Sequence, residues 1–278
     1  MGLLTRLRAR TAPPVVPVVR LHGVIGGVPG GRRSAGMTLS ALAPVLERAF
    51  RMPDAKAVAL LVNSPGGAPV QSSLIAKRIR LLAEEKKLPV LAFCEDVAAS
   101  GGYWLALAGD EVYVDDSSLV GSIGVVYAGF GFVDLIAKLG IDRRVHTAGE
   151  QKAILDPFRP EQGDDIARLQ RVQGEIHAAF IDHVKARRGT KLTGDDAELF
   201  SGAFWGGRTA VQLGLADAIG DLRSVLKQKF GPKVALRLVN PPRRRPWWRL
   251  RVRHDPVDML VDIGATLTER ALWSRYGL

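Results

Sequence analysis

The sequence predicts an α/β fold in which a parallel β-sheet is covered by helices on both faces. Residues 55–67 and 88–100 are apolar runs that end in polar loops, and a segment with helical character follows each of them. Strands that do not alternate between apolar and polar residues, and that alternate with helices along the chain, are typical of a buried parallel sheet. With 278 residues, 47% of them hydrophobic, the chain is long enough to bury such a core.

The individual elements follow from local patterns. Thr38 precedes a run in which Leu39, Leu42, Leu46 and Phe50 recur at helical spacing, so it is placed to cap a helix. The stripe formed by Ile166, Leu169, Ile176, Phe180 and Val184 predicts a long amphipathic helix over residues 161–188. The other predicted elements are strands at 16–25, 111–118 and 233–239, and helices after residue 67, at 101–109 and within 204–222.

Composition divides the chain into three parts. Residues 1–14 form a basic leader, residues 15–240 form the main domain, and residues 241–278 form a C-terminal segment. Prolines, a run of arginines and two adjacent tryptophans mark the start of that segment. Beyond them, helical spacing predicts an apolar stripe in the order Val257, Leu260, Val261, Leu267 and Ala271.

The net charge of +11 and the pI near 10.1 favour association with anionic surfaces. No window approaches the roughly 18 apolar residues of a membrane-spanning helix, and the start of the chain lacks a secretory apolar region. We therefore expect a cytoplasmic protein, and a peripheral location at the inner membrane is the alternative. The single cysteine, Cys94, has no partner for an internal disulfide.

Two loops carry the residues that could take part in a chemical reaction. The carboxyl ends of parallel strands meet at one edge of a sheet, so "NSPGG" (63–67) and "ASGG" (99–102) should lie together. Ser100 offers a hydroxyl at the first turn of a helix, where backbone N–H groups are unpaired. Gly66 and Gly67 on one loop can expose N–H groups, and the N–H of Gly101 on the other is placed to donate, so the two loops together can form an oxyanion hole. The structural alternative is that Ser100 only caps its helix.

A serine nucleophile needs a base. Of the five histidines only His146 is suggestively placed, and no aspartate is marked out to orient it. Lys152 follows a predicted strand and precedes an apolar patch, where burial would lower the pKa of its amine and let it act as a general base. Such a base predicts activity that rises toward alkaline pH.

Four ordered blocks of sequence resemble the bacterial signal peptide peptidase A family of the Clp-protease and crotonase superfamily. They are "LLVNSPGG", "VAASGGYWLALAGDEVYVDDSSLVGSIGV", "EQKAILDPFRP" and "FSGAFWGGRTAVQLGLADAIG". The resemblance implies a Ser/Lys dyad of Ser100 and Lys152, with Ser122 holding the lysine amine and Gly67 and Gly101 as the oxyanion hole. It also implies assembly into rings or domes, and leaves open whether Lys152 acts within one chain or on a neighbour.

The sequence is therefore interpreted as a serine endopeptidase that cleaves signal-peptide remnants or unfolded segments, without metal or organic cofactor. We expect it to lack the N-terminal membrane anchor of many relatives and, unlike some of them, to carry a single copy of the domain. Two alternatives stay open: a crotonase-type acyl-CoA enzyme, and a non-catalytic oligomeric scaffold that binds peptides or a membrane partner. For the basic, aromatic C-terminal segment, packing or peripheral membrane contact is favoured over nucleic acid.

Overall fold

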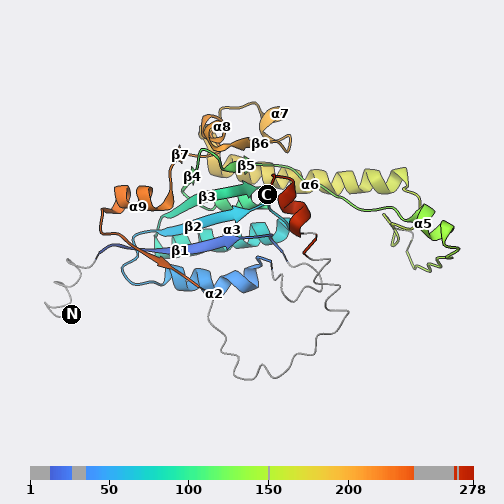
Figure 1. The fold of residues 1–278 in the computed structure, drawn as a ribbon, viewed down its shortest axis with the longest axis horizontal. Helices are drawn as coiled ribbons and strands as arrows, with labels where there is room; N and C mark the ends of the chain where they lie inside the picture. Colours follow the sequence, from blue (N-terminus) through green and yellow to red (C-terminus); the bar gives the residue numbers. More distant parts are fainter. Residues whose placement is uncertain (1–12, 27–35, 150, 241–265, 268) are drawn as a thin grey trace, which may run out of the picture.

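The structure is a computed structural model that describes residues 13–26, 36–149, 151–240, 266–267 and 269–278. Its centre is an eight-stranded sheet in the order β6-β5-β3-β2-β1-β8, with β4 paired to β3 and β7 (Figure 1). All pairs are parallel except β5 with β6. The strands are β1 (Val15–His22), β2 (Val58–Ser64), β3 (Val90–Ala99), β4 (Glu111–Val114), β5 (Leu119–Gly121), β6 (Phe204–Gly206), β7 (Ala218–Ile219) and β8 (Ala235–Leu238).

Both faces of the sheet are buried, as the sequence predicts. In β3, Ala92 and Cys94 point into the larger core, whereas Leu91 and Phe93 point into a smaller core on the opposite face. Helices α2, α3, α4, α6 and α8 contribute to the larger core, and α9 covers the other face. The helices are α2 (Leu39–Phe50), α3 (Pro69–Lys86), α4 (Gly101–Ala106), α5 (Val133–Lys138), α6 (Gly163–Arg188), α7 (Asp196–Leu199), α8 (Gly207–Gln212) and α9 (Leu222–Phe230), with a 3-10 turn at Gly189–Lys191.

The predicted start of α2 is confirmed. The hydroxyl of Thr38 accepts a hydrogen bond from the N–H of Ala41 (3.3 Å), which satisfies one free donor of the first turn. Gln71, on α3, accepts a second one from the N–H of Leu39 (2.8 Å). These contacts fix α2 beside α3 on the larger core.

The long helix α6 is buried only toward its C-terminal end. Phe180 and Val184 of the predicted stripe are buried, but Ile166, Leu169 and Ile176 are only partly covered. Figure 1 shows why: the N-terminal half of α6 extends beyond the sheet, together with the segment that carries α5. We call residues 125–162 the projecting arm. None of its described residues is buried.

The described part of the C-terminal segment is a short helix at the carboxyl ends of the strands (Figure 1). Leu267 and Ala271 of the predicted apolar stripe are helical and exposed. Val257, Leu260 and Val261 lie outside the described residues, as do most of the basic leader and the two adjacent tryptophans. Within the described ranges, no helix is both long and apolar enough to cross a membrane.

A buried tyrosine ties α4 to the loop after α8. The hydroxyl of Tyr103 donates to the carbonyl of Leu215 (2.8 Å), and burial raises the pKa of this phenol well above its ordinary value. We expect Tyr103→Phe to lower the free energy of unfolding by about 1–3 kcal/mol, because the carbonyl is left buried without its donor. Urea unfolding measures this. Tyr127→Phe, at an exposed ring, is the matched control, and equal losses in both variants would contradict the assignment.

Candidate active site

Ser100 lies at the sharp turn between β3 and α4. Its backbone has φ 53° and ψ −123°, and its N–H donates to the carbonyl of Gly121 (2.8 Å). Although Ser100 occupies the N-cap position, its hydroxyl accepts no hydrogen bond from the first turn of α4. The interpretation of Ser100 as a simple helix cap is therefore wrong, and its hydroxyl is left for another use.

Backbone strain gathers in the segments that carry the candidate residues. Within the described ranges, five non-glycine residues have positive φ. Asp54 belongs to a turn and Lys87 is the left-handed C-cap of α3, both common settings for this conformation. Ser100 (φ 53°), Ser122 (φ 52°) and Leu155 (φ 55°) are the other three. A non-glycine residue in this region costs about 1–3 kcal/mol and is typically kept where function requires the geometry.

The glycine-rich loop after β2 lies directly against Ser100. A Cβ atom on Gly66 would lie 2.8 Å from the Cβ of Ser100, and one on Gly67 would lie 2.1 Å from the carbonyl oxygen of Ile25. Both glycines have positive φ, at 104° and 141°. Only glycine permits this backbone conformation and this close approach. The two loops predicted to meet at the carboxyl edge do meet.

The N–H groups of this loop have different partners. That of Gly66 donates to the hydroxyl of Ser64 (3.2 Å) and is thereby used. Gly67 is exposed, and across the described residues no hydrogen bond engages its N–H or that of Gly101. The arrangement therefore leaves two backbone donors near the Ser100 hydroxyl, one on each loop. The free N–H of Gly67 agrees with the assignment of Gly67, rather than Gly66, as the oxyanion donor of this loop. The oxyanion hole itself stays a prediction.

Ser122 lies beside the same turn. It follows Gly121, which is paired with Ala99 across β5 and β3, and its N–H donates to the carbonyl of Ala203 (2.6 Å). Ser122 is half-buried. The structure therefore places the two candidate serines at neighbouring strand ends.

In the structure, Lys152 lies away from the two loops and from Ser122. It is exposed on the projecting arm, and its N–H donates to the carbonyl of Gly149 (3.2 Å). Figure 1 shows the arm directed away from the sheet. The expectation that Lys152 is buried is wrong for a single chain, because the arm has no core of its own. Within one chain the structure does not bring Lys152 to Ser100.

The sequence around Lys152 builds the arm. Arg143 donates to the carboxylate of Asp156 (3.1 and 2.9 Å) and stacks over the ring of Phe158 (4.8 Å to the centroid). The N–H of Phe132 donates to the carbonyl of Pro157 (2.6 Å). The N–H of Phe158, and then the Arg143 guanidinium, hold the pKa of Asp156 below its usual range. The "DPFR" part of the block thus fixes the loop that carries Lys152.

Sequence reasoning missed a polar pair that joins the two site loops. Asn63 donates through Nδ2 to the carboxylate of Asp96 (2.6 Å), and its Oδ1 accepts from the N–H of Val97 (3.2 Å). The pair spans the register shift between β2 and β3, just before the loops begin. The available signal was the appearance of polar residues directly after apolar strands. These contacts fix the position of one loop relative to the other.

The remaining titratable candidates are structural. Burial lowers the pKa of His183 to about 4, its ring stacks on Trp104 (4.9 Å between centroids), and its Nε2 lies 3.3 Å from the Trp104 carbonyl oxygen. His146 is exposed on the projecting arm. In the part of the chain that the structure describes, no group of three or more His, Cys, Asp or Glu residues is arranged to hold a metal ion.

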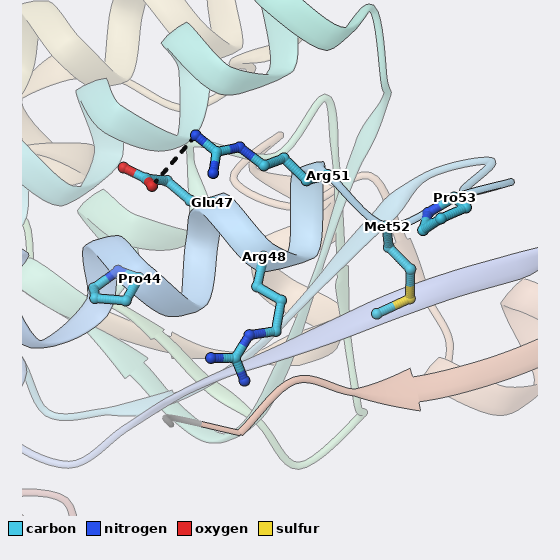
Figure 2. Close-up of a pocket in the computed structure, with 6 residues that line it drawn as sticks. All are labelled: Pro44, Glu47, Arg48, Arg51, Met52 and Pro53. Atoms are coloured by element: carbon cyan, nitrogen blue, oxygen red, sulfur yellow. Dashed lines mark ion pairs between the residues drawn. The ribbon is translucent and has the colours of Figure 1, made fainter. Parts of the chain in front are cut away.

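Two cavities lie away from Ser100. One, of about 440 Å³, is at the end of α2, where Glu47 faces Arg51 at 3.6 Å (Figure 2). Arg48 lines it and donates to the carbonyl of Asn240 (2.9 Å). The other, of about 510 Å³, lies between loops of the projecting arm. Neither is lined by Ser100, which is partly buried at the carboxyl edge of the sheet.

Cys94 is buried near this edge, and burial raises the pKa of its thiol to about 12. We expect native protein to resist thiol reagents at neutral pH for hours and to react fully in denaturant, because only the accessible thiolate reacts. Thiol titration measures this. Ser117→Cys adds a thiol at an exposed position and should react at once. Rapid reaction of the native parent protein would contradict the burial of Cys94.

Comparison with known proteins gives one family. The sequence profile described as peptidase family S49 matches residues 82–231. The "Serine protease SPPA, chloroplastic" of Arabidopsis thaliana is 32% identical over 224 residues, which are 77% of this chain and 32% of that protein. A solved structure of a lysine-to-alanine variant of the 1510-N membrane-bound stomatin-specific protease, in complex with a substrate peptide, has a TM-score of 0.51 at 15% identity. It covers 92% of this chain and 99% of that one, and at this identity it shows the fold alone.

A more similar relative carries a different name. The "Na(+)/H(+) antiporter NhaA" of Brucella abortus is 51% identical over 291 residues, which cover 100% of this chain and 39% of that protein. The chain thus spans about two fifths of one relative's length and about a third of the other's. This match covers the whole chain, so the residues matched by the peptidase profile, 82–231, lie within it.

Proposed function

Because the chain belongs to peptidase family S49, we propose that it hydrolyses peptide bonds with Ser100 as the nucleophile. The observation that carries this proposal is the backbone of Ser100. A serine with φ 53° stands at a strand-to-helix turn, its hydroxyl makes no capping hydrogen bond, and a second loop of glycines lies directly against it. The same strained strand-to-helix turn exposes the nucleophile in α/β-hydrolases, so the geometry has a chemical purpose.

The proposed reaction follows from the two loops. The Ser100 oxygen attacks the carbonyl carbon of the peptide, and its proton passes to a base. The N–H groups of Gly67 and Gly101 stabilise the oxyanion of the tetrahedral intermediate. The C–N bond then breaks, and the base returns the proton to the leaving amine. Water repeats the sequence on the acyl-enzyme and releases the second product.

We assign the base to Lys152 of a neighbouring copy. Lys152 is exposed on an arm that stands off its own core, so a second molecule is needed to desolvate its amine and deliver it to Ser100. The arm also exposes large apolar side chains, which a neighbouring copy would cover: Val126, Tyr127, Phe130, Leu135, Leu139, Ile141 and Val145. Ser122, half-buried beside the Ser100 turn, is the proposed partner of the incoming amine.

The proposed substrates are extended peptides, either signal-peptide remnants or unfolded segments. The site lies at the carboxyl edge of the sheet and is bordered by glycine and small apolar residues, which suits a polypeptide backbone. A cytoplasmic location, a ring or dome assembly and a peripheral contact with the inner membrane stay predictions.

The test is covalent labelling. A fluorophosphonate probe should add one label to the protein, and peptide mapping by mass spectrometry should place it on Ser100. The label should be absent from the Ser100→Ala protein. No other residue, including Ser117 and Ser118, should be labelled in either protein. A label on another residue, or equal labelling of the variant, would reject Ser100 as nucleophile.

A further inference from the structure

The C-terminal helix spans the carboxyl edge of the sheet. At one end of this span the ring of Trp273 lies against His22, the last residue of β1, with 6.0 Å between ring centroids. At the other end the ring of Tyr276 meets Phe204, the first residue of β6, edge-on at 5.2 Å. In the sheet order, β5, β3 and β2 lie between those two strands. These are the strands whose ends carry Ser122, Ser100 and the glycine loop.

One face of this helix rests on the protein. The half-buried residues are Glu269, Leu272, Trp273 and Tyr276, at the spacing of a single helical face. The alternate residues of the same turns are exposed: Arg270, Ala271, Ser274 and Arg275. We call residues 269–276 the strap.

The two residues that the strap contacts are close neighbours of the loops that carry Ser100 and Gly67. Phe204 is paired with Gly121, whose carbonyl accepts the N–H of Ser100 (2.8 Å). On the other side His22 precedes Gly23, whose N–H donates to the carbonyl of Asn63 (2.9 Å), the residue that opens the glycine loop. The strap therefore bridges the elements that hold the nucleophile and the oxyanion donors.

We propose that the strap closes the crevice over Ser100 and that a polypeptide substrate displaces it. This inference rests on the proposed function. None of the strap's residues is fully buried, and each of its two ring contacts is individually weak. Segments with few buried contacts open at low free-energy cost, which is what a displaceable closure requires.

The first experiment weakens the strap in the full chain. Trp273→Ala and Tyr276→Ala should each raise kcat/KM for a peptide of ten or more residues by roughly fivefold, since each removes one aromatic contact of the closed state. The rate of labelling by a small fluorophosphonate should change less than twofold. Arg275→Ala, on the exposed face of the same helix, is the matched control and should match the parent chain. Unchanged or lower kcat/KM in both aromatic variants would overturn the proposal.

The second experiment does not depend on turnover. Hydrogen exchange is followed in the Ser100→Ala protein with and without a saturating peptide, and binding is scored by protection of residues 63–67. Displacement predicts faster exchange of residues 269–276 in the bound state. Unchanged or slower exchange there, with residues 63–67 protected, would show that the strap is a fixed wall and reject the inference.

The two experiments separate the strap from the proposed function. If Ser100 is labelled and peptides are cleaved but the strap variants behave like the control, only the strap proposal fails. If Ser100 takes no label and peptides neither bind nor are cleaved, the proposed function fails and the strap proposal falls with it.

Discussion

Ser100→Gly should abolish peptide hydrolysis and at the same time make the protein more stable than Ser100→Ala. Loss of a nucleophile lowers kcat by about 10⁴-fold or more. Glycine accepts φ near 53° without steric cost, whereas alanine keeps the strain that serine carries. We expect a difference of about 1 kcal/mol in the free energy of unfolding between the two variants. Peptidase assays and urea unfolding of both proteins measure the two effects.

A carboxylate at the same edge provides the control. Burial raises the pKa of the Glu95 carboxyl, and a crotonase-type acyl-CoA enzyme would need such a group as its acid or base. Glu95→Gln should retain peptidase activity within about threefold of the parent chain, as expected of a group outside the Ser/Lys chemistry. If Glu95→Gln is inactive and Ser100→Gly is active, the acyl-CoA interpretation becomes the better one. Equal stability of the Ser100→Gly and Ser100→Ala proteins would contradict the strain at this position.

Lys152→Ala should also be inactive, yet mixing it with Ser100→Ala should restore activity. If each site takes Ser100 from one copy and Lys152 from the next, a random one-to-one ring contains intact sites at about a quarter of its interfaces. The mixture should therefore reach about a quarter of the activity of the parent chain after dissociation and reassembly. Either protein alone should stay at background. Peptide hydrolysis, with the assembly state followed by light scattering, measures the restoration.

The matched control is Lys138→Ala, which removes another exposed lysine of the projecting arm. It should be active by itself, because α5 has no assigned part in the chemistry. Mixtures that co-assemble without regaining activity would place both groups of the dyad in one chain. An active Lys152→Ala protein would remove Lys152 from the mechanism altogether.

The strands and their order of appearance could be predicted because both faces of the sheet are buried. Residues such as Leu91 and Ala92 are adjacent and both apolar, since they point into different cores. The same rule placed the glycine loop beside Ser100, because parallel strands end at one edge. Periodicity identified α6 as a helix, but it could not tell that only Phe180 and Val184 of its stripe would be buried.

The features that could not be predicted from the sequence depend on contacts between distant segments. Nothing local distinguishes a capping serine from one with positive φ, because the turn of Ser100 is held by the carbonyl of Gly121. The strap could not be predicted because its inward face includes Glu269 and Tyr276, so it is not marked by an apolar stripe alone. The apolar patch after Lys152 predicts burial of this lysine, but the structure leaves that whole segment outside the core.

The projecting arm has a consequence for the control of proteolysis. If Ser100 and Lys152 act from separate molecules, as proposed above, the catalytic unit is a property of the assembly, and its amount varies with a power of the protein concentration. A newly made or diluted chain then carries its nucleophile without a base and is harmless to other polypeptides. Under that proposal, neither a removable propeptide nor a separate inhibitor is needed for latency, because the arm is directed away from the sheet of its own chain.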